Sequence, residues 1–185
     1  MSRALWFLIE TLGSLLATAC VLRAAAMRFQ LPPRNPVSQF VIAITDWLVR
    51  PLRKVLPPSR GNDWASLAAA LLVALVMGLV WAVLFARGAE PMFAAVIPLA
   101  VFWLVKWTIY LVMGLVLLHA VLSWVNPHAP MAPTVEQLTR PFLAPLRRFV
   151  PLIGGVDLSP LILIVIAQVL LTLFESLFFS LVTSG

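Results

Sequence analysis

Four polar side chains interrupt long apolar runs of this 185-residue chain, and their types and positions could carry chemistry. They are Glu10, Lys106, Gln168 and Glu175. A charged group inside a membrane-spanning helix is costly, so it usually pairs with another polar group or lines an ion pathway. We expect Glu10, Lys106 and Glu175 to lie at a similar depth. The two interpretations are a structural ion pair or oligomer contact, and a role in conducting ions or handling protons.

A second set of candidate residues is basic and lies in two connectors between the apolar runs. These residues are Arg53, Lys54, Arg140, Arg147 and Arg148. Cationic clusters next to membrane spans bind anionic lipid headgroups, and they equally suit the acidic surface of a partner protein. The same residues also orient a protein in its membrane, which is compatible with either contact. Arg23, near the end of the first apolar run, is expected to extend toward the headgroups.

No residue pattern in the sequence predicts catalysis. His119 and His128 have no second ligand at the spacing of a metal site, and there is neither a glycine-rich phosphate loop nor a nucleophile elbow. Asp157 and Ser159 are close, but no base lies near them in sequence, and we expect Asp157 to cap a helix. The sequence therefore predicts neither an enzyme nor a bound cofactor or metal.

The composition is that of a membrane protein. Hydrophobic residues make up 62% of the chain and charged residues only 11%, whereas a soluble domain has about 25% charged residues. The mean hydropathy is +1.03. The formal net charge of +6 is concentrated in the connectors. We therefore expect the lipid bilayer and its anionic lipids, and no nucleic acid, to be the partners of the basic residues.

Four apolar runs are long enough to cross a bilayer, which takes about 20 helical residues. The predicted spans are residues 4–27, 65–86, 100–125 and 158–182. The third run starts near Phe93, and Pro98 suggests a break before its spanning part. Lys and Arg are more frequent in both connectors than on the opposite side. This asymmetry predicts cytoplasmic connectors, with both termini on the outer side of the cytoplasmic (inner) membrane.

The two connectors are copies of one another. Arg147 follows Arg53 by 94 residues, and Asp157 follows Asp63 by the same offset. The chain is therefore predicted to contain two tandem repeats, residues 1–91 and 92–185. We expect an all-α membrane protein with four transmembrane helices, arranged as two parallel two-helix repeats, each with an amphipathic interfacial connector.

Apolar residues recur at helical spacing in each connector. The predicted apolar face of the first connector comprises Val37, Phe40, Val41, Ile44, Trp47, Leu48, Pro51, Leu52 and Val55, and that of the second comprises Val135, Leu138, Phe142, Leu146 and Phe149. Such helices are typical of the membrane interface, where the apolar face enters the acyl boundary. The alternative is that each helix packs against other protein helices. Pro141 and Pro145 are expected to make the second helix irregular.

The motif in the second connector and the start of the last span resembles the YggT family of integral membrane proteins, called YlmG in some bacteria and plastids. The residues that carry the resemblance are Asn126, Pro127, Pro145, Pro151, Gly155, Asp157, Ser159 and Pro160. The resemblance covers nearly the whole chain as two repeats. In the first repeat, Trp47 replaces the first proline of the motif and Ala65-Ser66 replaces its Ser-Pro pair.

The resemblance implies a small inner-membrane protein with no established enzymatic activity. Relatives are linked to cell division, to nucleoid or thylakoid organisation, to cofactor assembly in plastids, and to osmotic tolerance or ion uptake. Our leading hypothesis is a non-enzymatic membrane scaffold that presents its connectors to lipid and to partner proteins of the division or envelope machinery. The alternative is a small channel or transporter subunit for osmotic stress or ion uptake, which would require a homo-oligomer.

Overall fold

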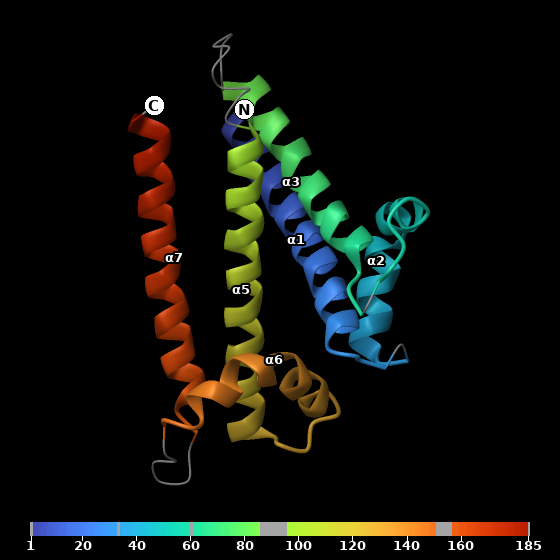
Figure 1. The fold of residues 1–185 in the computed structure, drawn as a ribbon, viewed down its shortest axis with the longest axis vertical. Coiled ribbons are helices and arrows are strands. Elements are labelled where there is room, and N and C mark those ends of the chain that lie inside the picture. Colours follow the sequence, from blue (N-terminus) through green and yellow to red (C-terminus); the bar gives the residue numbers. More distant parts are fainter. Residues whose placement is uncertain (1, 33, 60, 86–95, 151–156, 185) are drawn as a thin grey trace. The chain divides into compact units, whose positions relative to one another are not determined.

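The computed structural model describes residues 2–32, 34–59, 61–85, 96–150 and 157–184 of the chain (Figure 1). These residues form six α-helices, and outside the helices they form an isolated bridge between Ser59 and Asn62. The all-α prediction is therefore confirmed. The chain divides into two compact units, residues Met1–Thr108 and Ile109–Gly185. The predicted repeat boundary, between residues 91 and 92, lies outside the described residues.

Four of the helices are long and apolar enough to cross a membrane. They are α1 (Ser2–Arg28), α3 (Trp64–Phe85), α5 (Val96–Val125) and α7 (Ser159–Ser184). These bounds agree with the four predicted spans. The expected break at Pro98 is wrong, because α5 continues through this residue. Pro98 falls in the first helical turn, where its missing N–H removes no intrahelical hydrogen bond.

Small side chains bring α1 and α3 together in the first unit. Figure 1 shows the two helices side by side. The buried residues of α1 include Ala17, Cys20, Val21 and Ala24, and those of α3 include Ala65, Ala69, Ala70 and Ala74. Small residues let helix backbones approach closely, which is the main source of helix association in lipid. At Gly13 the approach is so close that a Cβ atom would lie 2.3 Å from Sδ of Met77.

The first connector forms α2 (Pro36–Arg53), which packs against both α1 and α3. Asn35 caps it by accepting a hydrogen bond from the N–H of Val37, at 2.9 Å. Its buried residues are Ser38, Val41, Thr45 and Val49. Most of the predicted apolar face points elsewhere, since Phe40 and Trp47 are exposed. The inner face thus packs on protein helices, and an aromatic face is left on the outside.

The second connector forms α6 (Ala132–Leu146), which contacts α7 and lies across its lower end in Figure 1. The helix continues through Pro141 and Pro145. Val135 and Leu138 were expected to enter the acyl boundary, and this is wrong because they are buried within the protein. From the same predicted face, Phe149 remains 85% exposed.

Candidate functional site

The same Arg–Asp ion pair occurs in both units. Arg53 donates a hydrogen bond to Oδ2 of Asp63, and Nε of Arg147 donates to Oδ2 of Asp157 at 2.7 Å. The two residues of each pair are ten positions apart. Each arginine stands at the end of a connector helix, and each aspartate precedes the following span. The pair therefore closes the loop that carries the chain from the connector into the membrane.

Both aspartates also cap the helix that they precede. Oδ1 of Asp63 accepts the N–H of Ser66 at 3.2 Å, and Oδ1 of Asp157 accepts the N–H of Ser159 at 2.9 Å. The capping role expected of Asp157 is therefore observed. A carboxylate at this position satisfies an otherwise unpaired backbone N–H and interacts favourably with the positive end of the helix dipole.

Burial by itself would raise the pKa of both carboxyl groups. For Asp63, the hydrogen bonds from Arg53 and Ser66 outweigh burial, so its pKa is lowered from the usual 3.8. For Asp157, hydrogen bonds from Ser159 and Arg147 likewise leave the pKa below 3.8. Both groups are therefore charged at neutral pH, as an ion pair and a cap require.

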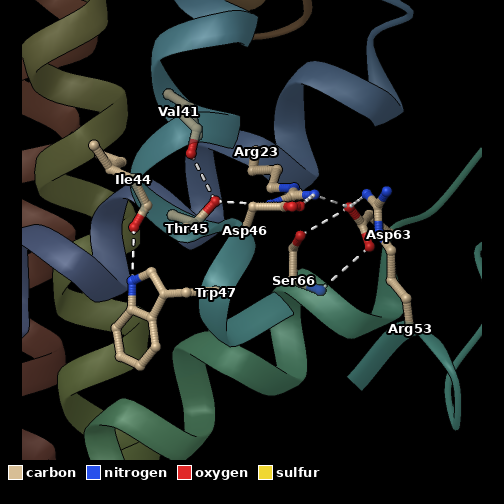
Figure 2. Close-up of polar contacts among 9 residues, drawn as sticks. All are labelled: Arg23, Val41, Ile44, Thr45, Asp46, Trp47, Arg53, Asp63 and Ser66. Atoms are coloured by element: carbon tan, nitrogen blue, oxygen red, sulfur yellow. Dashed lines mark hydrogen bonds and ion pairs between the residues drawn. The ribbon is translucent and has the colours of Figure 1, made fainter. Parts of the chain in front are cut away.

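In the first unit, Arg23 joins three segments around this ion pair (Figure 2). Its Nη1 donates to Oγ1 of Thr45 at 2.9 Å, and its Nη2 donates to Oδ1 of Asp46 at 3.0 Å. Its Nε lies 3.9 Å from Oδ2 of Asp63. Arg23 is only 5% exposed, so the expectation that it extends to the headgroups is wrong. It instead fixes α2 and the start of α3 to α1.

In the second unit, His119 stands beside the ion pair. Nη2 of Arg147 lies 2.9 Å from Nε2 of His119. A guanidinium has no acceptor atom, so Nε2 must accept this hydrogen bond and the ring proton must be on Nδ1. His119 and Arg147 line a cavity of about 170 Å³ together with Ser123 and Glu136. The two units therefore share the ion pair but surround it with different side chains.

A larger cavity, of about 230 Å³, lies beside the ion pair of the first unit. Its lining residues are Arg23, Ala26, Met27, Leu31, Ser38, Val41, Ile42, Arg53 and Asp63. Most of these side chains are apolar, but two guanidinium groups and a hydroxyl also reach it. Such a site suits a ligand that combines hydrogen-bond acceptors with an apolar part.

The five basic residues predicted to contact lipid or a partner fall into two groups. Lys54, Arg140 and Arg148 are exposed. Arg53 and Arg147 are occupied by the aspartates, with side chains 37% and 36% exposed. The sequence analysis overlooked these pairs, although the equal offsets of the arginines and aspartates in the two repeats contained the signal.

The polar residues predicted inside the spans occupy different environments. Glu10 is exposed on α1, and Nζ of Lys106 lies 5.9 Å from the ring centre of Phe102. On α7, Gln168 is exposed and Glu175 is partly buried. The pairing of Glu10 with Lys106, and the participation of Glu175, remain predictions. Among the described residues, no three His, Cys, Asp or Glu side chains gather as metal ligands would.

The remaining motif residues mark the ends of helices. Asn126 and Pro127 follow α5, and Pro145 is in the last turn of α6. Ser159 and Pro160 begin α7 and are buried. Pro151 and Gly155 lie outside the described residues. In the described part of the chain, the motif therefore builds the turns that lead into and out of the connector.

These features define a class of protein: a multi-pass α-helical membrane protein with two similarly built connectors. The chain belongs to the CCB3/YggT family, whose model matches residues 2–84 and 98–178. The two matched segments are consistent with tandem repeats. The resemblance inferred from the motif is thereby confirmed.

Several relatives match the chain over most of its length. The uncharacterized protein YggT of Escherichia coli strain K12 is 32% identical over 173 residues, which cover 90% of this chain and 86% of the relative. An uncharacterized protein in the proC 3' region of Vibrio alginolyticus is 32% identical over 160 residues, or 86% of each chain. An uncharacterized protein of Pseudomonas aeruginosa is 29% identical over 163 residues, covering 87% of this chain and 83% of the relative. No solved structure matches the chain.

Proposed function

We propose that this protein is a non-enzymatic scaffold of the cytoplasmic membrane, with both connectors on the cytoplasmic surface in contact with anionic lipid. The observation that carries the proposal is the way the connector charges are distributed. Asp46, Asp63 and Asp157 are each held by an arginine. The basic side chains exposed on the connectors are Arg28, Arg34, Arg50, Lys54, Arg140 and Arg148. The outward charge of the connectors is therefore mainly positive.

Exposed apolar side chains accompany these charges. Phe40 and Trp47 are 65% and 68% exposed on α2, and Phe149, just beyond α6, is 85% exposed. Aromatic residues next to Lys and Arg favour the zone between headgroups and acyl chains. Each exposed cation contributes about 1 kcal/mol of attraction to an anionic leaflet. The same surfaces would present the connectors to membrane proteins of the division or envelope machinery.

The lipid contact can be tested by electron spin resonance on the full protein reconstituted in vesicles. Spin-labelled anionic and zwitterionic phospholipids report the fraction of lipid whose motion the protein restricts. We expect the anionic label to be preferred at low salt and the preference to weaken at high salt, because exposed charges are screened. Equal restriction of both labels at low salt would contradict the proposal.

The chain offers matched variants for this measurement. Lys54→Gln with Arg148→Gln removes exposed cations and should lower the preference for anionic lipid without changing thermal stability. Arg53→Gln with Arg147→Gln removes the neighbouring cations that hold Asp63 and Asp157. This control removes the same charge but should lower thermal stability.

A second candidate function is a channel or transporter subunit for osmotic stress or ion uptake. The observation that favours it is the exposure of Glu10 and Gln168 on helices that are otherwise apolar. Polar groups facing lipid are costly, so these side chains favour contact with a second copy of the chain. Ion flux into liposomes containing the purified protein, abolished by Glu10→Gln, would support a channel. Absence of flux in the wild-type protein would support the scaffold.

A further inference from the structure

The cavity of about 230 Å³ in the first unit contains polar atoms that are not satisfied by the protein. Nε of Arg23, Nε of Arg53 and Oγ of Ser38 are buried, and none of them has a hydrogen-bond partner. Arg23 and Ser38 are each only 5% exposed. Buried donors without acceptors are rare in folded proteins because they lose their hydrogen bonds to water and gain none in return. Three such donors lining one cavity indicate a ligand with several acceptor atoms.

The charges around the cavity limit what that ligand is. Arg23 and Arg53 contribute two positive charges, and Asp63 in the wall contributes one negative charge. Asp46, which pairs with Arg23, is not part of the wall and has a side chain 43% exposed. The wall alone therefore carries one positive charge, which the outer carboxylate balances. A singly charged group with several acceptor oxygens suits this arrangement better than a multiply charged free anion.

The rest of the wall is apolar, which requires that the ligand also has an apolar part. Ala26, Met27, Leu31, Val41 and Ile42 line the cavity beside the polar atoms. Ile42 is 37% exposed, so it lies at the rim. The polar end of a ligand would meet the arginines, and its apolar end would leave past Ile42. Both properties belong to a phospholipid, and the surrounding helices place the cavity at the end of a span.

We propose that this cavity holds one membrane phospholipid. Its phosphodiester oxygens accept hydrogen bonds from Nε of Arg23, Nε of Arg53 and Oγ of Ser38. Its glycerol and first methylene groups lie against Ala26 and Met27. This is a one-to-one site, and it goes beyond the proposed function, in which exposed side chains contact the fluid leaflet.

The second unit provides a contrast within the same chain. At the offset that relates Arg53 to Arg147, Ala132 stands in place of Ser38. His119, rather than an arginine from the preceding span, contacts Arg147. The cavity there is smaller and is lined by Ser123, Glu136 and other polar groups. The second unit therefore lacks two of the three unsatisfied donors, and we assign the phospholipid to the first unit alone.

Native mass spectrometry of the full protein, purified in a mild detergent, tests the proposal. We expect one phospholipid per chain to remain bound, and titration of the delipidated protein with phospholipid to restore this stoichiometry. Arg23→Lys with Ser38→Ala keeps the charge but removes two donors, and should weaken binding about tenfold or more, as loss of charge-assisted hydrogen bonds does. Arg147→Lys, the matched change in the second unit, should leave the bound lipid in place.

A second variant guards against the double change simply failing to fold. Ala26→Leu keeps every polar group and fills the apolar side of the cavity, so it should also expel the lipid. Added phospholipid should raise the melting temperature of the delipidated wild-type protein but not that of Ala26→Leu, because a ligand stabilises only a state that binds it. Equal lipid occupancy in wild type, Ala26→Leu and the double variant would overturn the proposal, as would a wild-type protein that retains no lipid.

The source of the phosphate group and the independence of this site can be read from the same titration. Inorganic phosphate in excess should not displace the lipid. Displacement, or binding of phosphate in its place, would show a site for free phosphate and overturn the lipid assignment. Lys54→Gln with Arg148→Gln should keep the bound phospholipid even though it loses the preference for anionic lipid. Failure of the proposed function and failure of this site are thus distinguishable.

Discussion

Arg53 at the end of α2 is held by Asp63 at the entrance to α3, and the same contact joins Arg147 to Asp157 94 residues later. A loop that turns from a connector into the membrane must satisfy the first N–H groups of the next helix. One aspartate does this with one oxygen and binds the arginine with the other. Each repeat thus builds the connector and the following span as one piece.

The first prediction concerns the unequal burial of these two ion pairs. Asp63 has no exposed side-chain surface, whereas 19% of the Asp157 side chain is exposed. Asp63→Asn should therefore lower the free energy of unfolding by about 2–3 kcal/mol, because Arg23 and Arg53 lose a buried counter-charge. Asp157→Asn should cost about 1 kcal/mol. Unfolding of the purified variants by denaturant would measure both, and equal losses would contradict the burial argument.

The second prediction is the pH dependence of stability. The folded-state pKa of Asp63 and Asp157 lies below the ordinary value of 3.8. Their contribution to stability is therefore present above that ordinary value and is lost as pH falls through the lowered folded-state pKa. The wild-type protein should lose stability in this acidic range. The double variant Asp63→Asn, Asp157→Asn should show a flatter profile, and an identical profile would refute the assignment.

The third prediction uses two glycines of the spans. A Cβ at Gly13 would meet Met77, but a Cβ at Gly114 would meet nothing within 4 Å. Gly13→Ala should lower the free energy of unfolding by about 1–2 kcal/mol through overpacking, and Met77→Ala should relieve part of this loss. Gly114→Ala should be neutral or should stabilise by up to about 1 kcal/mol through helix propensity. Equal effects at both positions would show that α1 and α3 do not pack closely in the membrane.

The fourth prediction concerns topology, which rests on the distribution of Lys and Arg. Exposed Arg50, Lys54, Arg140 and Arg148 place both connectors in the cytoplasm by the positive-inside rule. Reporters that are active only in the cytoplasm should be inactive when fused to either terminus. They should be active when inserted after His128, in the turn between α5 and α6. Strong activity from a terminal fusion would reverse the orientation.

Composition and length were sufficient to predict the four spans, because few other structures contain such long uncharged runs. The face of α2 was harder, since apolar residues occur on more than one side of this helix. Periodicity gave Phe40 and Trp47 the same weight as Val41, and only packing against α1 and α3 distinguishes Val41 as buried. Proline statistics likewise overstated the effect of Pro98, whose position in the first turn removes the penalty.

The site was predicted only in part, because its geometry depends on contacts between segments. Arg23 has the sequence context of a residue that extends to the headgroups, but Thr45 and Asp46 supply partners inside the protein. The unsatisfied donors of the cavity have no sequence signature at all. The Arg–Asp pairs are different, because opposite charges at equal spacing in two repeats already predict a shared contact.

The central claim is that the connectors lie on the membrane surface, and a spin label at the exposed Phe149 tests it most directly. The single cysteine, Cys20, is buried, so Cys20→Ser with Phe149→Cys allows labelling at one position, with Leu173→Cys on α7 as a reference for depth. Accessibility to oxygen and to a water-soluble nickel complex reports depth in anionic vesicles. The account predicts a label at the headgroup–acyl boundary, shallower than the label at residue 173. A label at residue 149 as accessible to nickel as one in bulk water would contradict it.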